Sequence, residues 1–248
     1  MQTGVSVRRA VKTTSGRSSA HLACCAGLEI TKQLSASESN QVFAACRTAS
    51  EELKAVPNVA AIIENIDVGS SDVGKTLFGS LAGQAPFHVV INNAGILKDA
   101  NILEVQDEDM MQHFNVNSVG PIRVTQALLN AGLVAGDAKL IYVSSILGSM
   151  GDRPAGGLYS YRMSKAALNM AVATMANELT TLAEQDKVPK GLIVSTVHPG
   201  WVATDMGSAK APVQPTDAAA SIIKHTQELT AAASGHFVDM TTGKDLPW

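Results

Sequence analysis

From residue 27 onward, short apolar runs of strand length alternate with longer segments of helical length, and this alternation restricts the fold more than any other feature. Strands are expected over residues 42–46, 59–66, 88–91, 139–144, 192–197 and 236–239, and helices over residues 28–35, 51–55, 71–83, 107–131, 161–184 and 216–229. A strand, a helix and a further strand in succession form a right-handed crossover between parallel strands. The sequence therefore predicts an α/β fold with one doubly wound parallel sheet, helices on both faces and a ligand site beyond the carboxyl ends of the strands.

The composition fits one such domain and excludes several classes of function. A chain of 248 residues, 46% of them hydrophobic, can bury a full core in a single domain. The net charge of −3, without a long basic run, argues against nucleic acid as a partner. The sequence contains no run of about 18 apolar residues, the length needed to span a membrane. The three cysteines, Cys24, Cys25 and Cys46, lack metal-ligand spacing. They indicate a reducing compartment, so we expect a cytoplasmic protein without a metal site.

The N-terminal segment differs from the remainder of the chain. Its basic residues, Arg8, Arg9, Lys12 and Arg17, all precede the first acidic residue, Glu29, and serine and threonine are frequent among them. This composition is typical of an organellar transit peptide, and an ordinary irregular N-terminus is the alternative. A ragged first strand over residues 5–11 would give the sheet seven strands instead of six. We therefore divide the chain into an atypical segment, 1–26, transit-like or disordered, and a doubly wound domain, 27–248.

The segment from residue 140 to residue 169 carries the chemistry. A short apolar run ends in Ser144 and Ser145, a loop containing glycines follows, and a predicted helix then places Tyr161 and Lys165 on one face, because they are four residues apart. A hydroxyl, a phenol and an ammonium group can therefore converge. A nearby cation stabilises a phenolate and lowers the pKa of the phenol, so we expect this group to transfer a proton near neutral pH.

Further motifs lie before and after this segment. The sequence reads NNAG at residues 92–95, HFNVNSVGP at 113–121 and HPGWVATDM at 198–206. Together with SSILGSM and YSYRMSKAALN, these motifs resemble the short-chain dehydrogenase/reductase family, and in particular its C-factor or Sniffer-like carbonyl reductase branch. The resemblance implies a Rossmann-like fold and an oxidoreductase that interconverts a carbonyl and an alcohol by hydride transfer, with an aldehyde or ketone as the small-molecule substrate.

The resemblance also assigns roles to individual residues. It implies that Tyr161 is the general acid/base, that Ser145 rather than Ser144 orients the substrate carbonyl, that Lys165 lowers the pKa of the phenol, and that Asn117 holds a water for proton relay. The cofactor-binding residues that it implies are Gly27, Arg47, Asp67, Val68, Asn93, Ala94, Gly95, Tyr161, Lys165, Pro199, Gly200, Val202 and Thr204. Segment 205–215 is expected to form a mobile lid over the substrate.

Arg47 decides the expected cofactor. A carboxylate after the second strand would accept hydrogen bonds from the ribose diol of NAD, whereas an arginine can pair with the 2′-phosphate of NADP. The sequence therefore favours NADP(H) over NAD(H).

The resemblance covers residues 27–248 and departs from the family pattern before them. The family's first turn uses glycines to bring the backbone close to the cofactor pyrophosphate. Only Gly27 coincides with a family glycine, and the other motif positions hold Ala20, His21 and Cys25. Two hypotheses follow: an active reductase, and a catalytically impaired remnant or binding protein of the same fold.

The predicted helix 161–184 indicates a second copy as a partner. Its small and apolar residues are too many for one stripe facing a sheet: Ala166, Ala167, Met170, Ala171, Ala173, Met175 and Ala176. Members of the family commonly pair this helix and the helix at 107–131 in a four-helix bundle. We therefore expect a homodimer.

Overall fold

The computed structural model describes residues 4–7, 11–13, 26–152 and 155–248. Its strands are β1 (Gly4–Val7), β2 (Val11–Thr13), β3 (Val42–Ala45), β4 (Val59–Ile63), β5 (Phe87–Asn92), β6 (Val134–Val143), β7 (Ile193–His198) and β8 (Phe237–Asp239). Its α-helices are α1 (Ala26–Ser35), α2 (Glu51–Lys54), α3 (Val73–Leu81), α4 (Asp107–His113), α5 (Gly120–Asn130), α6 (Tyr159–Glu184) and α7 (Pro215–Glu228). A π-helical turn, η1 (Phe114–Val119), and two 3-10 turns, η2 (Ile146–Gly148) and η3 (Ala231–Ala233), complete the elements.

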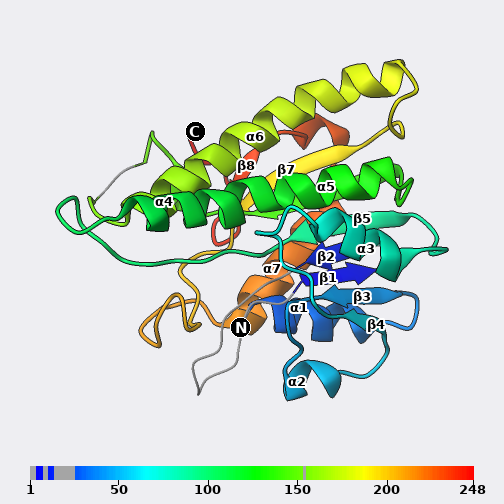
Figure 1. Cartoon of the computed structure of the whole chain (residues 1–248), viewed down its shortest axis with the longest axis horizontal. Helices are drawn as coiled ribbons and strands as arrows, with labels where there is room; N and C mark the ends of the chain where they lie inside the picture. Colours follow the sequence, from blue (N-terminus) through cyan, green and yellow to red (C-terminus); the bar gives the residue numbers. More distant parts are fainter. Residues whose placement is uncertain (1–3, 8–10, 14–25, 153–154) are drawn as a thin grey trace.

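The strands form one sheet in the order β4-β3-β1-β2-β5-β6-β7-β8 (Figure 1). β3 and β4 are parallel, and β5, β6, β7 and β8 run parallel to one another. The chain builds one half of the sheet outward from the centre to β4 and then the other half outward to β8. The predicted doubly wound α/β fold is therefore confirmed.

The N-terminal strands correct the prediction of an entirely parallel sheet. β1 runs antiparallel to both β3 and β5, whereas β2 is parallel to them. Ala44 of β3 is in register with Val5 of β1 and also with Lys12 of β2. Either direction can pair there, because a strand edge offers donors and acceptors to parallel and antiparallel partners alike. The residues that the structure describes form eight strands, whereas six or seven were expected.

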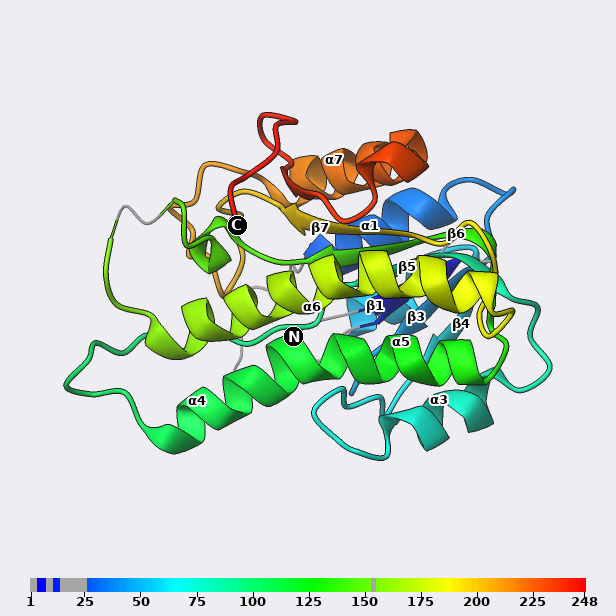
Figure 2. The ribbon, with the colours of Figure 1, turned by 90° about the horizontal axis from the view of Figure 1, so that it is seen from above.

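Helices cover both faces of the sheet, and each face has its own core (Figure 2). α1 and α7 pack on one face through residues such as Ile30 and Ile222, which are fully buried. α3, α5 and α6 pack on the other face through residues such as Leu77, Leu128 and Val172. The apolar run of β6 lies between the two cores, with alternate side chains pointing to each, as the period of a strand requires. In the part of the chain that the structure describes, no helix has the length and apolar character of a transmembrane segment.

Most expected elements are present, with shifted ends, and one differs in kind. The helix expected over residues 107–131 is divided into α4, η1 and α5, because the chain adopts a π-helical turn between the two α-helical parts. Such wide turns occur frequently at functional sites. Gly120 follows this turn, and a side chain there would approach Val68 to 2.9 Å, so glycine allows the helix to lie against the loop after β4.

Candidate active site

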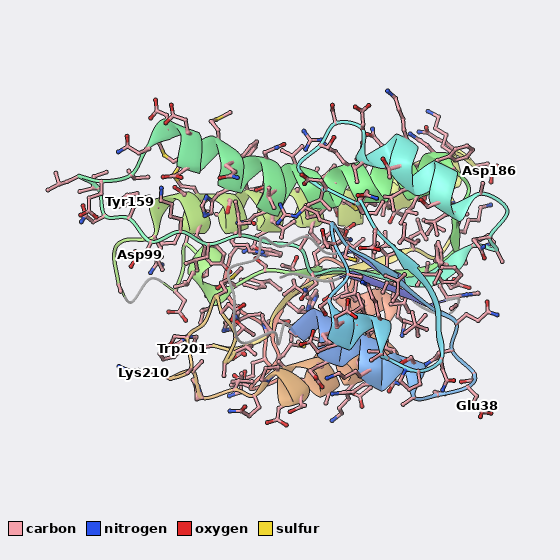
Figure 3. The ribbon with its side chains drawn as sticks, turned by 60° about the horizontal axis from the view of Figure 1, so that its bottom comes forward. Glu38, Asp99, Tyr159, Asp186, Trp201 and Lys210 are labelled. Carbon is pink, nitrogen blue, oxygen red and sulfur yellow. The ribbon has the colours of Figure 1, made fainter. Side chains whose placement is uncertain are left out.

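The carboxyl ends of β5, β6 and β7 gather the predicted site at one end of the molecule. In Figure 3, labelled residues on the segments around these strand ends lie together (Asp99, Tyr159, Trp201 and Lys210), and Glu38 and Asp186 lie at the opposite end. This is the edge at which doubly wound sheets bind ligands. A cavity of about 620 Å³ is found elsewhere, at the far end of α6 beside Glu184, away from the predicted catalytic residues.

Two neighbouring serines end β6 and have different surroundings. Ser144 donates from its hydroxyl to Oδ1 of Asn169 at 2.6 Å and is therefore occupied within the protein. Ser145 begins the η2 turn, and its Oγ accepts a hydrogen bond from the backbone N–H of Leu147 at 3.2 Å. The hydroxyl of Ser145 also lies close enough to the phenol of Tyr161 to lower its pKa. The structure thus brings Ser145, rather than Ser144, next to the phenol.

Tyr161 and Lys165 lie in the first turns of α6, and both are buried, at 7% and 3% exposure. The ammonium of Lys165 donates to the carbonyl of Val143, the last residue of β6, at 2.8 Å. Its Nζ lies 5.7 Å from the centre of the Tyr161 ring. The predicted hydroxyl, phenol and ammonium therefore do converge, from a strand end and a helix face.

The absence of a side chain at Gly148 allows Ser145 and Lys165 to lie close together. A Cβ atom at Gly148 would lie only 2.8 Å from two atoms of Lys165, its backbone carbonyl carbon and its Cβ. A real Cβ atom does not tolerate such a contact. Gly148 therefore permits the η2 turn to rest directly on the part of α6 that carries Lys165.

Burial is the main cause of the shifted pKa values of Tyr161 and Lys165. Burial raises the pKa of Tyr161 to about 12, and the hydrogen bond with Ser145 opposes this rise. Burial lowers the pKa of Lys165 to about 8. The sequence predicted that Lys165 lowers the pKa of the phenol. In the structure the pKa of Tyr161 is raised instead, because desolvation of the buried phenolate outweighs the hydrogen bond with Ser145.

Asn117 lies in η1 and is fully buried. Its Oδ1 accepts from the backbone N–H of Ile96 at 2.7 Å, and its Nδ2 donates to the carbonyl of Ile96 and to Oγ of Ser164, both at 2.9 Å. The amide thus ties the segment after NNAG to α6. Since both amide hydrogens are used, the water predicted at this residue would have to be bound by other atoms.

Segment 67–69 follows β4 and is held by residues of η1 and α5. The carboxylate of Asp67 accepts from the N–H of Gly69 at 2.8 Å. Asn115 donates to the carbonyl of Gly69 at 2.7 Å, and Arg123 donates to Asn115 Oδ1 at 2.6 Å and to the carbonyl of Val68 at 3.3 Å. One irregular helix therefore contacts both this loop and, through Asn117, the segment after β5.

The NNAG and HPG segments follow strands as predicted. Asn93 is half-buried directly after β5, and Ala94 and Gly95 are buried beside it. Gly200, after Pro199, has φ +89°, and a Cβ there would approach Thr241 to 2.7 Å, so only glycine fits.

The loop after Gly200 folds back on itself. Val202 is buried and pairs with Val213 in a parallel bridge, and Thr204 Oγ1 accepts from the N–H of Gly207 at 3.2 Å. The indole N–H of Trp201 donates to the carbonyl of Gly207. The expected lid over 205–215 is thus tied down at several points.

The two remaining predicted positions lie on the β1–β4 side of the sheet. Arg47 is half-buried after β3, and its carbonyl accepts from the N–H of Asn65 at 3.0 Å. Gly27 lies in the first turn of α1, where its carbonyl accepts from Thr31 Oγ1 at 2.8 Å. The other motif positions, Ala20, His21 and Cys25, lie outside the residues that the structure describes.

Comparison with known proteins decides the family. The profile of the short chain dehydrogenase family matches residues 23–214. The chain belongs to the short-chain dehydrogenase family. The C-signal protein of Myxococcus xanthus is 39% identical over 165 residues, which are 66% of this chain and 93% of that protein.

Solved carbonyl reductases of the same family share the fold. The carbonyl reductase Sniffer of D. melanogaster superposes with a TM-score of 0.73 at 28% identity, over 95% of this chain and 98% of the other. The NADPH-bound carbonyl reductase from chicken fatty liver superposes with a TM-score of 0.72 at 26% identity, over 90% and 94%. The chain is therefore an oxidoreductase of the short-chain dehydrogenase type.

Lys165, beside the end of β6, can bind the ribose of a nicotinamide cofactor. An ammonium group has three N–H donors, and among the residues that the structure describes Lys165 uses one of them, on Val143. The other two can bind ribose hydroxyls. For the described residues, no group of His, Cys, Asp and Glu suits a metal ion.

Sequence reasoning missed several residues that shape the site. Asn169 contacts Ser144 and the η2 turn, and Asn115 and Arg123 hold the loop after β4. The sequence does carry a signal for Asn169, because it continues the four-residue spacing of Tyr161 and Lys165. The positions of Asn115 and Arg123 depend on the π-helical turn, which the sequence pattern did not indicate.

Proposed function

We propose that this chain is an NADP(H)-dependent carbonyl reductase in which Tyr161 is the general acid/base. The observation that carries the proposal is the buried phenol of Tyr161, whose ring centre lies 5.7 Å from Nζ of Lys165 and whose pKa is lowered by the nearby hydroxyl of Ser145. The likeness to a carbonyl reductase that binds NADPH supports it. The substrate class is a small aldehyde or ketone.

The side chains have distinct tasks in the reduction direction. The hydroxyls of Ser145 and Tyr161 donate hydrogen bonds to the substrate carbonyl, which fixes its orientation and polarises it. The bound cofactor supplies the hydride. With a pKa of about 12, Tyr161 is protonated at neutral pH and is suited to give its proton to the carbonyl oxygen. The charge of Lys165 then stabilises the phenolate that remains.

The cofactor contacts follow the predicted positions. Lys165 would bind the nicotinamide ribose, Asp67 and Val68 the adenine, and Arg47 the 2′-phosphate that distinguishes NADP from NAD. Arg47→Asp should reverse the preference from NADPH to NADH. A wild-type protein that prefers NADH tenfold would contradict the role of Arg47.

A catalytically impaired remnant or binding protein is the second candidate. It is favoured by the sequence of the first turn, where His21 and Cys25 replace residues of the glycine motif. A non-glycine residue at positive φ costs about 1–3 kcal/mol, and each lost charge-assisted phosphate contact costs roughly 1.5–3 kcal/mol. This candidate predicts cofactor affinity at least ~100-fold weaker than that of a chain with the intact motif.

Fluorescence titration with NADPH separates the two candidates. Micromolar binding supports the reductase, and no binding at millimolar NADPH supports the remnant. Tyr161→Phe should then abolish reduction of p-nitrobenzaldehyde and preserve NADPH binding. Tyr159→Phe, two residues earlier on α6, is the matched control and should retain activity. Unchanged turnover in Tyr161→Phe would refute the mechanism.

The proposal extends to the assembly and its place in the cell. Apolar side chains on α4, η1 and α6 are exposed at Met111, Phe114, Met163 and Met170, with exposures from 45% to 67%. A second copy that pairs these helices would cover them, so we propose a homodimer. A cytoplasmic location, with residues 27–248 as the reductase domain and no nucleic acid or membrane partner, completes the proposal; targeting by residues 1–26 to an organelle is its alternative.

A further inference from the structure

Asn169 is a buried polar residue of α6 to which the reaction assigns no task. It follows Lys165 by four residues and Tyr161 by eight, so the three side chains occupy one face of the helix. Its exposure is 3%, and an amide buried to this extent must be hydrogen-bonded.

The two hydrogen bonds of Asn169 lie on either side of Ser145. Its Oδ1 accepts from Oγ of Ser144 at 2.6 Å, and its Nδ2 donates to the carbonyl of Gly148 at 3.3 Å. Ser144 precedes Ser145, and Gly148 ends the η2 turn that Ser145 begins. One side chain of α6 therefore holds both ends of the turn that carries Ser145.

The outer side of the same turn is held by a different part of the chain. Ser149 donates from Oγ to the carbonyl of Pro247 at 2.6 Å, and Gly151 donates from its N–H to the carbonyl of Trp248 at 2.9 Å. Trp248 stacks on Phe237 of β8, with ring centres 5.8 Å apart. The outer contacts place the turn against β8, whereas Asn169 relates it to the helix of Tyr161 and Lys165.

We infer that Asn169 is a positioning residue that sets the distance between Ser145 and Tyr161. The inference rests on the proposed function, because it concerns the two hydroxyls that bind the substrate carbonyl. The helix fixes Asn169 relative to Tyr161, and the two hydrogen bonds fix the turn relative to Asn169. Without them, the turn keeps its outer contacts but is free to move away from α6.

The test compares Asn169→Ala with Asn177→Ala. Asn177 lies on the same helix two turns later, is exposed, and within the described part of the chain donates only to the carbonyl of Ala173 of its own helix, at 3.5 Å. We expect Asn169→Ala to lower kcat/KM for p-nitrobenzaldehyde 10–100-fold, since a displacement of about 1 Å can cost that much. The Kd of NADPH should change less than twofold. Asn177→Ala should match the wild type.

The pH profile separates positioning from a purely structural role. The hydrogen bond of Ser145 lowers the pKa of Tyr161, so its loss raises that pKa. In alcohol oxidation, where the phenolate is the base, the rise of the rate with pH should shift to higher pH in Asn169→Ala. A lower Tm with an unmoved pH profile, or a loss no greater than that of Asn177→Ala, would overturn the inference.

A second measurement tests the inference even if the wild-type protein has no reductase activity. That inactivity would refute only the proposed function. Hydrogen exchange of segment 145–149 should be faster in Asn169→Ala than in the wild type, while segment 237–239 is unchanged. Equal exchange in segment 145–149 would overturn the positioning role even in an inactive protein.

Discussion

Gly148→Ala should damage the site with a change of one methyl group. The added Cβ would lie 2.8 Å from the backbone carbonyl carbon and the Cβ of Lys165 and 3.0 Å from the N of Ala166. Ordinary contact begins at 3.4 Å, so the η2 turn and α6 must separate by about 0.6 Å. Neither side is a flexible side-chain end. The displacement therefore falls on Ser145, Lys165 or both.

The size of the effect follows from this overlap. Forcing an extra methyl group into packed backbone costs about 1–3 kcal/mol in the free energy of unfolding. For a chain of this length each kcal/mol lowers Tm by about 2–4 °C, so a decrease of roughly 2–12 °C is expected. Misplacement of Ser145 by more than half an ångström should also reduce kcat/KM by about tenfold or more.

Gly156→Ala is the matched control, because Gly156 lies in the loop between Ser145 and Tyr161 and an added Cβ would have no heavy atom of the described residues within 4 Å. Both variants are compared with the wild type by thermal unfolding and by steady-state reduction of p-nitrobenzaldehyde. Gly156→Ala should retain activity and Tm. If Gly148→Ala shows less than a twofold loss and an unchanged Tm, the turn does not press on α6 as the structure indicates, and the reasoning fails.

Three further predictions concern charge, cofactor and assembly. Lys165 has a pKa of about 8 and is charged below it, so the rate of reduction should fall as the pH rises through about 8; a flat rate from pH 7 to 9 would contradict this. Arg123→Met removes the hydrogen bond to Val68 and should weaken NADPH binding about tenfold in a fluorescence titration; Lys75→Met, at an exposed position of α3, is the control. Met170→Glu should shift a homodimer to monomers in light scattering; a wild-type protein that is monomeric at micromolar concentration would refute the predicted dimer.

The sequence alone was sufficient to predict the class of fold and the helix face that Tyr161 and Lys165 share. Alternating strand and helix lengths determine a doubly wound sheet, because parallel strands need a crossover and the crossover has one hand. The spacing of Tyr161 and Lys165 determines that they share a helix face, and the serines after β6 must lie at the carboxyl edge. These are local properties of the chain, so the sequence pattern alone predicts them.

The tertiary structure decided the features that depend on packing between distant segments. Burial, not proximity to Lys165, dominates the pKa of Tyr161, and burial exists only once the sheet and helices have closed around the phenol. The resemblance already favoured Ser145 over Ser144, and the structure adds a physical reason: a hydrogen bond to Asn169, 25 residues away, occupies Ser144. The antiparallel pairing of β1 with β3 and β5 likewise has no sequence signature. It depends on backbone groups of two other strands, which accept a neighbour of either direction.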